Sequence, residues 1–170
     1  FIQTGIMDTR AMAWLGTGLI VAATLAGFVL VYLRGPMALP CGIVGLLAAV
    51  LYSLGPVRLN ATGVGELVVG FAFGVLPVTG AAWLQSGEIT PALIVFSLPV
   101  SAWVAAILLI NEVPDMRADA TAAKKTLPVR IGRARTAKVY LVMHLVGFAA
   151  IAGYVCLVVN VNESQLAEPL

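Results

Sequence analysis

The sequence predicts an all-α protein, an integral membrane helical bundle with about five transmembrane helices. Hydrophobic residues make up 61% of its 170 residues and charged residues only 11%, and the mean hydropathy is +1.01. A soluble domain of this size would need many more charges on its surface. The apolar residues also form five long runs, each near the ~20 residues that a helix needs to cross a bilayer. The lipid bilayer is therefore the first expected partner.

Each apolar run is expected to form one helix. The runs cover residues 11–33, 37–54, 64–85, 91–110 and 139–159. The first three breaks contain residues that favour turns, namely Arg34-Gly35-Pro36, Gly55-Pro56 and Ser86-Gly87. Prolines inside the runs predict kinks, because neighbouring helices in a bundle can satisfy the freed carbonyls. Since the links are short, residues 1–170 are expected to form a single domain.

The lysines and arginines predict how the helices are oriented. If the N-terminus, the second connection and the fourth connection share one side, that side holds nine of the ten basic residues, and the other holds only Arg34. An excess of lysine and arginine marks the cytoplasmic side. The polar connection at residues 111–138 is therefore expected on the cytoplasmic side of the cell's inner or plasma membrane.

Two further compositional features exclude function classes. The basic residues form no patch with interleaved aromatics, so no nucleic acid partner is expected. The two cysteines, Cys41 and Cys156, lie within apolar runs, where a thiol usually behaves as a small buried hydrophobe. No disulfide and no cysteine metal site is therefore expected.

The polar segment at residues 111–130 carries the residues that suggest chemistry. Asp115 and Asp119 are four residues apart, so in a helix they share a face and could hold a divalent cation together. Lys124 and Lys125 follow within reach of an anion. A diphosphate would be repelled by two aspartates alone, but Mg²⁺ can bind carboxylate and phosphate oxygens at once. We interpret the segment as a Mg²⁺-bridged diphosphate site, with ordinary solvated charges as the alternative.

Three residues are expected near this segment: one from the second run, one from the connection after it and one from the third run. Tyr52 lies at the end of the second run and Arg58 just beyond it. Glu66 lies in the first turn of the third run, where the positive end of the helix stabilises its carboxylate. With the lysines, Arg58 could neutralise the charge that grows on a departing diphosphate.

These motifs resemble a known family. Asn111-Glu112-Val113-Pro114-Asp115 with Asp119, followed by Lys124-Lys125-Thr126-Leu127 and Val129-Arg130-Ile131-Gly132, is similar to the second aspartate-rich motif of the UbiA superfamily of intramembrane prenyltransferases. Tyr52-Ser53-Leu54-Gly55-Pro56 and Gly63-Val64-Gly65-Glu66 resemble its menaquinone branch, the 1,4-dihydroxy-2-naphthoate polyprenyltransferases. The resemblance covers about residues 5–159.

The resemblance implies an enzyme of quinone biosynthesis. Such an enzyme would transfer a polyprenyl group from a polyprenyl diphosphate to an aromatic acceptor of the 1,4-dihydroxy-2-naphthoate type, with Mg²⁺ assisting ionisation of the diphosphate. It implies that Asp115 and Asp119 are Mg²⁺ ligands and that Tyr52 lies near the reacting end of the prenyl group. The residues implied for diphosphate binding and orientation are Lys124, Lys125, Arg58 and Asn111.

The sequence departs from the family pattern in two places. Ala123 stands where family members commonly have glycine, and the family's first aspartate-rich motif, Asn-Asp-x-x-x-Asp, has no counterpart here. Family members are also expected to have about nine helices, so the chain is interpreted as the middle of a longer protein. A non-catalytic paralogue or fragment is therefore one alternative. A small transporter is another, although the middles of the five runs carry no charge.

Overall fold

The computed structural model describes residues 8–54 and 57–166, and every element in these ranges is helical. This confirms the predicted all-α class. The predicted Gly55-Pro56 turn lies outside the described residues. The chain divides into two compact units, Phe1–Val44 and Gly45–Leu170. The expectation of a single domain stays a prediction.

Four helices are long and apolar enough to cross a bilayer, and a fifth is apolar but shorter. The four are Thr9–Arg34, Gly65–Ser86, Pro91–Thr121 and Arg133–Val159, and the shorter one is Leu39–Ser53. With 15 residues, this last helix is about 22 Å long, whereas the hydrocarbon core is ~30 Å thick. Five apolar helical segments are thus found where five are predicted.

The first unit is a helix followed by a sharp break. Helix α1 (Thr9–Arg34) ends at Gly35, whose φ of 89° lies in a region that favours glycine. The Gly35 N–H donates to the Val31 carbonyl oxygen at 2.8 Å. The short 3-10 helix η1 (Pro36–Ala38) follows and leads into α2 (Leu39–Ser53). The predicted Arg34-Gly35-Pro36 break is therefore confirmed.

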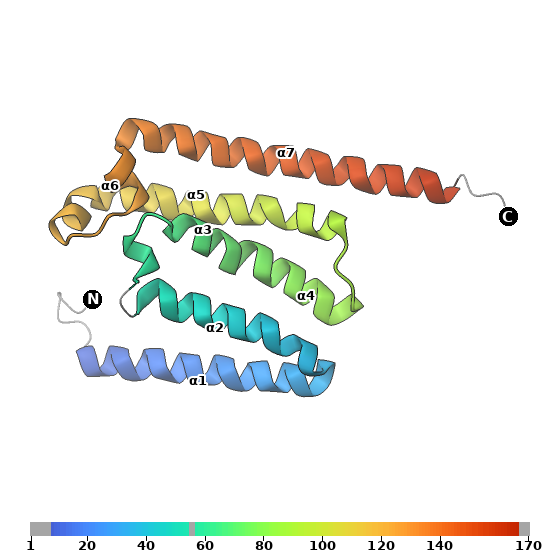
Figure 1. Cartoon of the computed structure of the whole chain (residues 1–170), viewed down its shortest axis with the longest axis horizontal. Helices are drawn as coiled ribbons and strands as arrows, with labels where there is room; N and C mark the ends of the chain where they lie inside the picture. Colours follow the sequence, from blue (N-terminus) through green and yellow to red (C-terminus); the bar gives the residue numbers. More distant parts are fainter. Residues whose placement is uncertain (1–7, 55–56, 167–170) are drawn as a thin grey trace. The chain divides into compact units, whose positions relative to one another are not determined.

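The second unit contains the remainder of α2 and all later elements (Figure 1). These are η2 (Leu59–Ala61), α3 (Gly65–Gly70), the π-helical turn η3 (Phe71–Val75), α4 (Leu76–Ser86), α5 (Pro91–Thr121), α6 (Leu127–Ile131) and α7 (Arg133–Leu166). Elements α3, η3 and α4 form one continuous rod. Helix α5 contacts this rod and also contacts α7, so it is the central helix of the unit.

Small residues let α5 approach its neighbours closely. A Cβ added to Gly74 of η3 would collide with the backbone of Ser101 on α5, and one added to Gly70 would lie 3.0 Å from the Ser101 carbonyl oxygen. On the other side of α5, a Cβ added to Gly147 would lie 2.7 Å from Nε1 of Trp103. Such small-residue contacts are typical of helix pairs in membranes, where close backbone approach replaces the hydrophobic effect.

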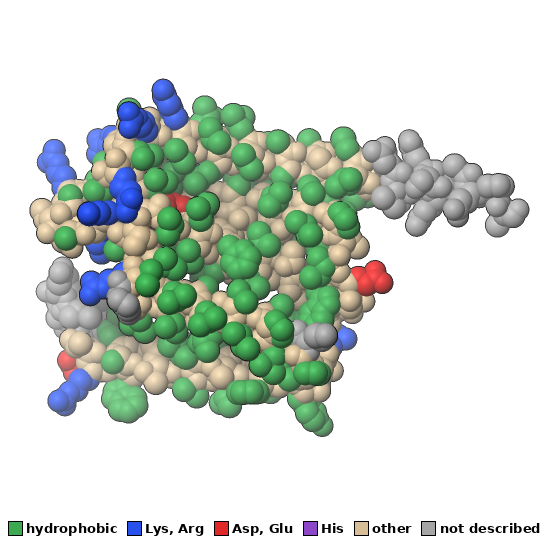
Figure 2. Space-filling view, viewed as in Figure 1, with side chains coloured by type: hydrophobic (Ala, Val, Ile, Leu, Met, Phe, Trp, Pro, Cys, Tyr) green, Lys and Arg blue, Asp and Glu red, His purple; other side chains and the backbone are tan. Residues whose placement is uncertain are grey.

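The surface of the second unit is apolar along its helices and basic at one end. Large apolar side chains such as Leu67, Phe73 and Leu141 are exposed, whereas Ala105 and Ala106 are buried. This is the reverse of a soluble protein and fits contact with lipid. On the face shown in Figure 2, lysine and arginine side chains gather around α6 and the adjoining end of α7. The charged side chains that could form a functional site therefore lie at this end of the unit.

Helix α5 is longer than the apolar run that predicts it. The run ends at Ile110, but the helix continues to Thr121, and α7 begins at Arg133 instead of residue 139. Once a helix has formed, it needs helix-forming residues to continue, not apolar ones, and residues 116–120 include Met116, Arg117 and Ala118. Pro114 lies within the helix, where it removes one backbone hydrogen bond. The aspartate motif therefore lies on the last turns of α5.

Candidate active site

Two connections meet at the polar end of the second unit. The first, residues 57–64, joins α2 to α3, and the second, residues 122–126, joins α5 to α6. The Lys125 N–H donates to the Ala61 carbonyl oxygen at 2.9 Å, and Nε of Arg130 donates to the Lys125 carbonyl oxygen at 2.8 Å. Gly63 lies against Arg130, because an added Cβ would be 2.7 Å from its Nε. The connections at residues 57–64 and 122–126 are thus in contact and joined by a backbone hydrogen bond.

The end of α5 carries an aspartate that is paired with a lysine. Nζ of Lys124 lies 3.3 Å from Oδ1 of Asp119, and the Asp119 side chain is only 13% exposed. The Lys124 N–H also donates to the Asp119 carbonyl oxygen at 2.9 Å. Asp115 lies one turn earlier on the same helix and is exposed. One carboxylate is therefore held by a lysine, and the other is open to solvent.

Deeper in the unit, two glutamates from different helices lie together. Glu66, in the first turn of α3, is only 2% exposed, and Glu112, on α5, is half-buried. Their carboxyl groups are within hydrogen-bonding range of each other. Within the described part of the chain, Oε1 of Glu66 and Oε2 of Glu112 are buried and receive no hydrogen bond from any other residue. One proton shared between the two carboxyl groups would relieve their repulsion.

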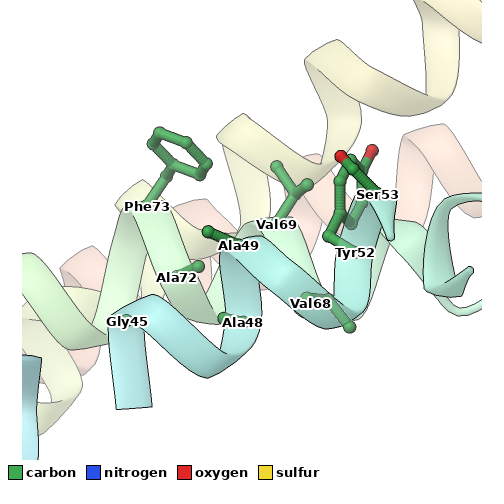
Figure 3. A pocket seen from close by; sticks show the side chains of 9 residues that line it. All are labelled: Gly45, Ala48, Ala49, Tyr52, Ser53, Val68, Val69, Ala72 and Phe73. Carbon is green, nitrogen blue, oxygen red and sulfur yellow. The ribbon is translucent and has the colours of Figure 1, made fainter. Parts of the chain in front are cut away.

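An apolar groove lies between α2 and the rod formed by α3 and η3 (Figure 3). Its volume is about 320 Å³, and it is lined by Gly45, Ala48, Ala49, Tyr52, Ser53, Val68, Val69, Ala72 and Phe73. The hydroxyl groups of Tyr52 and Ser53 lie at one end of the groove, and Phe73 lies at the other. The Tyr52 ring is next to Gly65, which precedes the buried Glu66 in the first turn of α3. The groove therefore ends near the glutamate pair.

The structure brings some of the predicted site residues together and leaves others at the rim. Asp119 and Lys124 form an ion pair, and the Tyr52 ring lies against Gly65, the residue before the buried Glu66. The side chains of Asn111, Asp115, Arg58 and Lys125 are exposed, on the segments that meet at this end. The sequence motifs predicted no role for Glu112. A signal was present, because Glu112 precedes Asp119 by seven residues and so shares its face of the helix.

The carboxylates at this end of the unit can be compared with the needs of a metal ion. Among the described residues, no group of three or more histidine, cysteine, aspartate or glutamate side chains is arranged to hold one. Mg²⁺ is commonly held by one or two carboxylates, with waters and substrate phosphates completing its coordination. Asp115 and Asp119 supply two carboxylates one turn apart. These two residues fit the protein's share of such a site.

The fold and the site define a class: an integral membrane protein built from helices, with an apolar groove that ends near carboxylates and lysines. Comparison of the sequence with models of protein families supports this class. The model of the UbiA prenyltransferase family matches residues 2–163. The chain therefore belongs to the UbiA prenyltransferase family, as its motifs suggest.

Similar proteins come from the menaquinone branch that the motifs resemble. The chain is 33% identical over 145 residues to the 1,4-dihydroxy-2-naphthoate octaprenyltransferase of Mycobacterium tuberculosis. The matched region covers 85% of this chain and 46% of that protein. It is 31% identical over 137 residues to the Haemophilus influenzae protein of the same name, covering 77% and 44%. The Escherichia coli protein is 33% identical over 119 residues, covering 69% and 36%.

The chain thus spans less than half the length of each of these relatives. No solved structure matches the chain.

Proposed function

We propose that this chain acts in the transfer of a polyprenyl group from its diphosphate to an aromatic acceptor of the 1,4-dihydroxy-2-naphthoate type, in quinone biosynthesis. The observation that carries the proposal is the combination of Asp115, Asp119 and Lys124 at one polar end with an apolar groove that ends nearby. A prenyl diphosphate has this same division between a long apolar chain and a small anionic head. The similarity to two 1,4-dihydroxy-2-naphthoate octaprenyltransferases supports the acceptor class.

In this proposal the residues around the end of α5 bind the diphosphate. Asp115 and Asp119 would hold Mg²⁺, which when bound would supply positive charge that favours departure of the diphosphate. Lys124, whose side chain is 47% exposed, would place its ammonium group against the phosphate. The other diphosphate contacts come from side chains at the rim, namely Lys125, Arg58 and Asn111. Positive groups placed where negative charge grows lower the barrier to ionisation.

The apolar groove receives the prenyl chain in the same proposal. Apart from two hydroxyl groups, its walls are aliphatic and aromatic side chains and backbone, which favour burial of a hydrocarbon. Tyr52, at its polar end, would lie beside the allylic carbon, with the ring facing the positive charge that develops there. Phe73, at the opposite end, would face the prenyl chain away from the reacting carbon.

The proposed reaction breaks one bond to the prenyl group and forms another. The allylic carbon–oxygen bond breaks, and its electron pair leaves with the diphosphate. A ring carbon of the acceptor then supplies the electron pair for the new carbon–carbon bond. The same ring carbon then releases a proton, or CO₂ where it bears the carboxylate, and the electron pair of the broken bond restores the aromatic ring. Because the acceptor ring attacks a cation-like carbon, electron-donating hydroxyl groups on the ring would speed this step.

The aspartates provide the test of the proposal. In the full-length protein, replacing both by alanine, Asp115→Ala with Asp119→Ala, is expected to lower the rate of Mg²⁺-dependent prenyl transfer by roughly a hundredfold or more, since the metal's protein ligands are lost. The control is Glu88→Gln, because Glu88 is an exposed acidic residue on the connection between α4 and α5. Equal transfer by the double variant and the control would refute the mechanism.

The orientation of the chain belongs to the same proposal. The aspartate end is assigned to the cytoplasmic side, where the excess of lysine and arginine is expected to lie. A water-soluble diphosphate product could then leave directly into the cytoplasm, while the prenylated product stays in the bilayer.

A further inference from the structure

Arg130 lies on α6, in the Val129-Arg130-Ile131-Gly132 motif, and the proposed function gives it no role. Its side chain is held in place, because Nε donates to the Lys125 carbonyl oxygen at 2.8 Å. A Cβ added to Gly63 would lie 2.7 Å from Nε and 2.8 Å from Cδ, so the backbone packs closely against this part of the side chain. The Nε end of the guanidinium group is therefore fixed between two polar connections.

The two terminal nitrogens of this guanidinium group are unused. A guanidinium group has five N–H donors, and the bond from Nε accounts for one of them. Within residues 8–54 and 57–166, the structure shows no ion pair and no hydrogen bond to the other four. Arg130 is also exposed, so an anion can reach these donors from the solvent. Arg130 is thus a fixed cation whose terminal N–H groups can bind a ligand.

The sequence around Arg130 favours an anionic ligand. Residues 120–162 contain no aspartate or glutamate, but they contain six basic residues, namely Lys124, Lys125, Arg130, Arg133, Arg135 and Lys138. Lys124 is paired with Asp119 on α5, whereas α6 and the start of α7 carry only positive charges. A surface with one sign of charge raises the local concentration of ions of the opposite sign.

Arg130 also lies close to the polar end of the apolar groove. Gly63, which contacts Arg130, is two residues before Gly65, and a Cβ on Gly65 would lie 3.7 Å from the Tyr52 ring. Two residues along a chain span at most about 7.6 Å between their Cα atoms. Tyr52 lies at the polar end of the groove (Figure 3). The Arg130 side chain and the Tyr52 ring therefore contact the same short segment, residues 63–65.

The acceptor in the proposed function carries a charge that has no partner there. A 1,4-dihydroxy-2-naphthoate has a carboxylate on its ring, but Lys124, Lys125 and Arg58 are assigned to the diphosphate. The two aspartates would repel a carboxylate. A guanidinium group binds a carboxylate through two parallel hydrogen bonds, and the unused N–H groups of Arg130 can form them.

We propose that Arg130 binds the carboxylate of the aromatic acceptor and so places the acceptor ring at the end of the groove, beside Tyr52. The inference rests on the proposed function and names the residue that recognises the acceptor. The bond to Lys125 and the contact with Gly63 hold the guanidinium group, and its terminal nitrogens bind the carboxylate. Aromatic acceptors with a ring carboxylate are thereby preferred over neutral ones.

The test measures binding of two acceptor probes to the full-length protein in detergent, under reducing conditions at neutral pH. The probes are 1,4-dihydroxy-2-naphthoate and its 2-carboxamide, which has nearly the same shape but no charge. Wild type is expected to bind the carboxylate about tenfold or more tightly than the carboxamide, because hydrogen bonds between charged groups are the stronger ones. In Arg130→Gln this preference is expected to fall to about twofold or less, since the charged donors are lost.

Three controls accompany this variant. The affinity of Arg130→Gln for the neutral carboxamide should stay within about threefold of wild type, because that probe makes no ionic contact. Lys138→Gln removes one positive charge from an exposed position on α7 and should keep the full preference. Arg130→Lys keeps the charge but loses the paired donors, so it should keep a preference of about threefold. A prenyl thiolodiphosphate with Mg²⁺ should bind within about twofold of wild type in every variant, because no residue assigned to the diphosphate is changed.

Each outcome separates this inference from the function on which it rests. If wild type transfers prenyl groups and Arg130→Gln keeps the full preference for the carboxylate, the inference is wrong and the proposed function stands. If Arg130→Gln weakens binding of the thiolodiphosphate and keeps that preference, Arg130 serves the diphosphate and the inference is again wrong. If Arg130→Gln and Arg130→Lys weaken all three probes equally, Arg130 only joins the two connections, which also overturns the inference. If wild type binds no probe and transfers no prenyl group, the proposed function fails as well.

Discussion

At the scale of single residues, Lys124 is paired with Asp119 and, in the proposed function, also contacts the diphosphate. It pairs with Asp119 at 3.3 Å while its side chain remains 47% exposed, so it is free to move towards a bound diphosphate. Lys124→Ala is expected to raise the KM for the polyprenyl diphosphate by about tenfold, because a charge-assisted contact is lost. Steady-state kinetics with a fixed acceptor concentration measure this. Lys138→Ala removes the same charge from an exposed position on α7 and should leave the KM unchanged, and an equal effect of both would contradict the assignment.

Gly63 determines how closely the two polar connections approach. Its φ is 76°, and a Cβ would lie 2.7 Å from Nε of Arg130, which donates to the Lys125 carbonyl oxygen. Gly63→Ala is therefore expected to lower the free energy of unfolding by about 2–4 kcal/mol, from backbone strain together with displacement of Arg130. Thermal unfolding in detergent measures the loss. The control Gly87→Ala has a similar φ of 80° but open space around it, and it should cost only about 1 kcal/mol.

At the scale of helices, the contact of η3 with α5 holds the rod in place. Since a Cβ on Gly74 would collide with the Ser101 backbone, Gly74→Ala must push the two helices apart. The expected loss of stability is about 1–3 kcal/mol, seen as a lower Tm. Gly153→Ala on α7 is the matched control, because its nearest neighbour is a side-chain carbon of Val95 at 3.9 Å. A change at Gly74 as mild as the one at Gly153 would show that the helices are not in contact.

At the scale of the whole molecule, the two ends of α5 are expected on opposite sides of the membrane. After Cys41 and Cys156 are replaced by serine, single cysteines are introduced by Glu88→Cys, before α5, and Ala122→Cys, just after it. In intact cells, a thiol reagent that cannot cross the membrane should label the cysteine at 88 and label the one at 122 only after permeabilisation. Labelling of both positions in intact cells would contradict the orientation.

The sequence predicted the elements well because local signals specify them. Apolar run length located the membrane segments, and glycine and proline located the break after α1. The end of α5 was missed because a helix continues through polar residues once it has begun. The pairing of Glu66 with Glu112 could not be predicted either. It depends on how α3 lies against α5, which is determined by the contact of Gly70 and Gly74 with Ser101, and no local pattern reports such a contact.

The π-helical turn Phe71–Val75 has a consequence for chain length. A π-turn closes its hydrogen bonds over five residues instead of four, so it holds one residue more than an α-helical turn. Deleting one residue there would let the rod become a uniform α-helix while the segments on either side kept nearly the same register, because the turn already absorbs the extra residue. A deletion elsewhere in the rod would rotate everything beyond it by about 100°. The rod can therefore tolerate a one-residue gap at this turn better than at any other point along its length, and single-residue gaps between related chains should fall there.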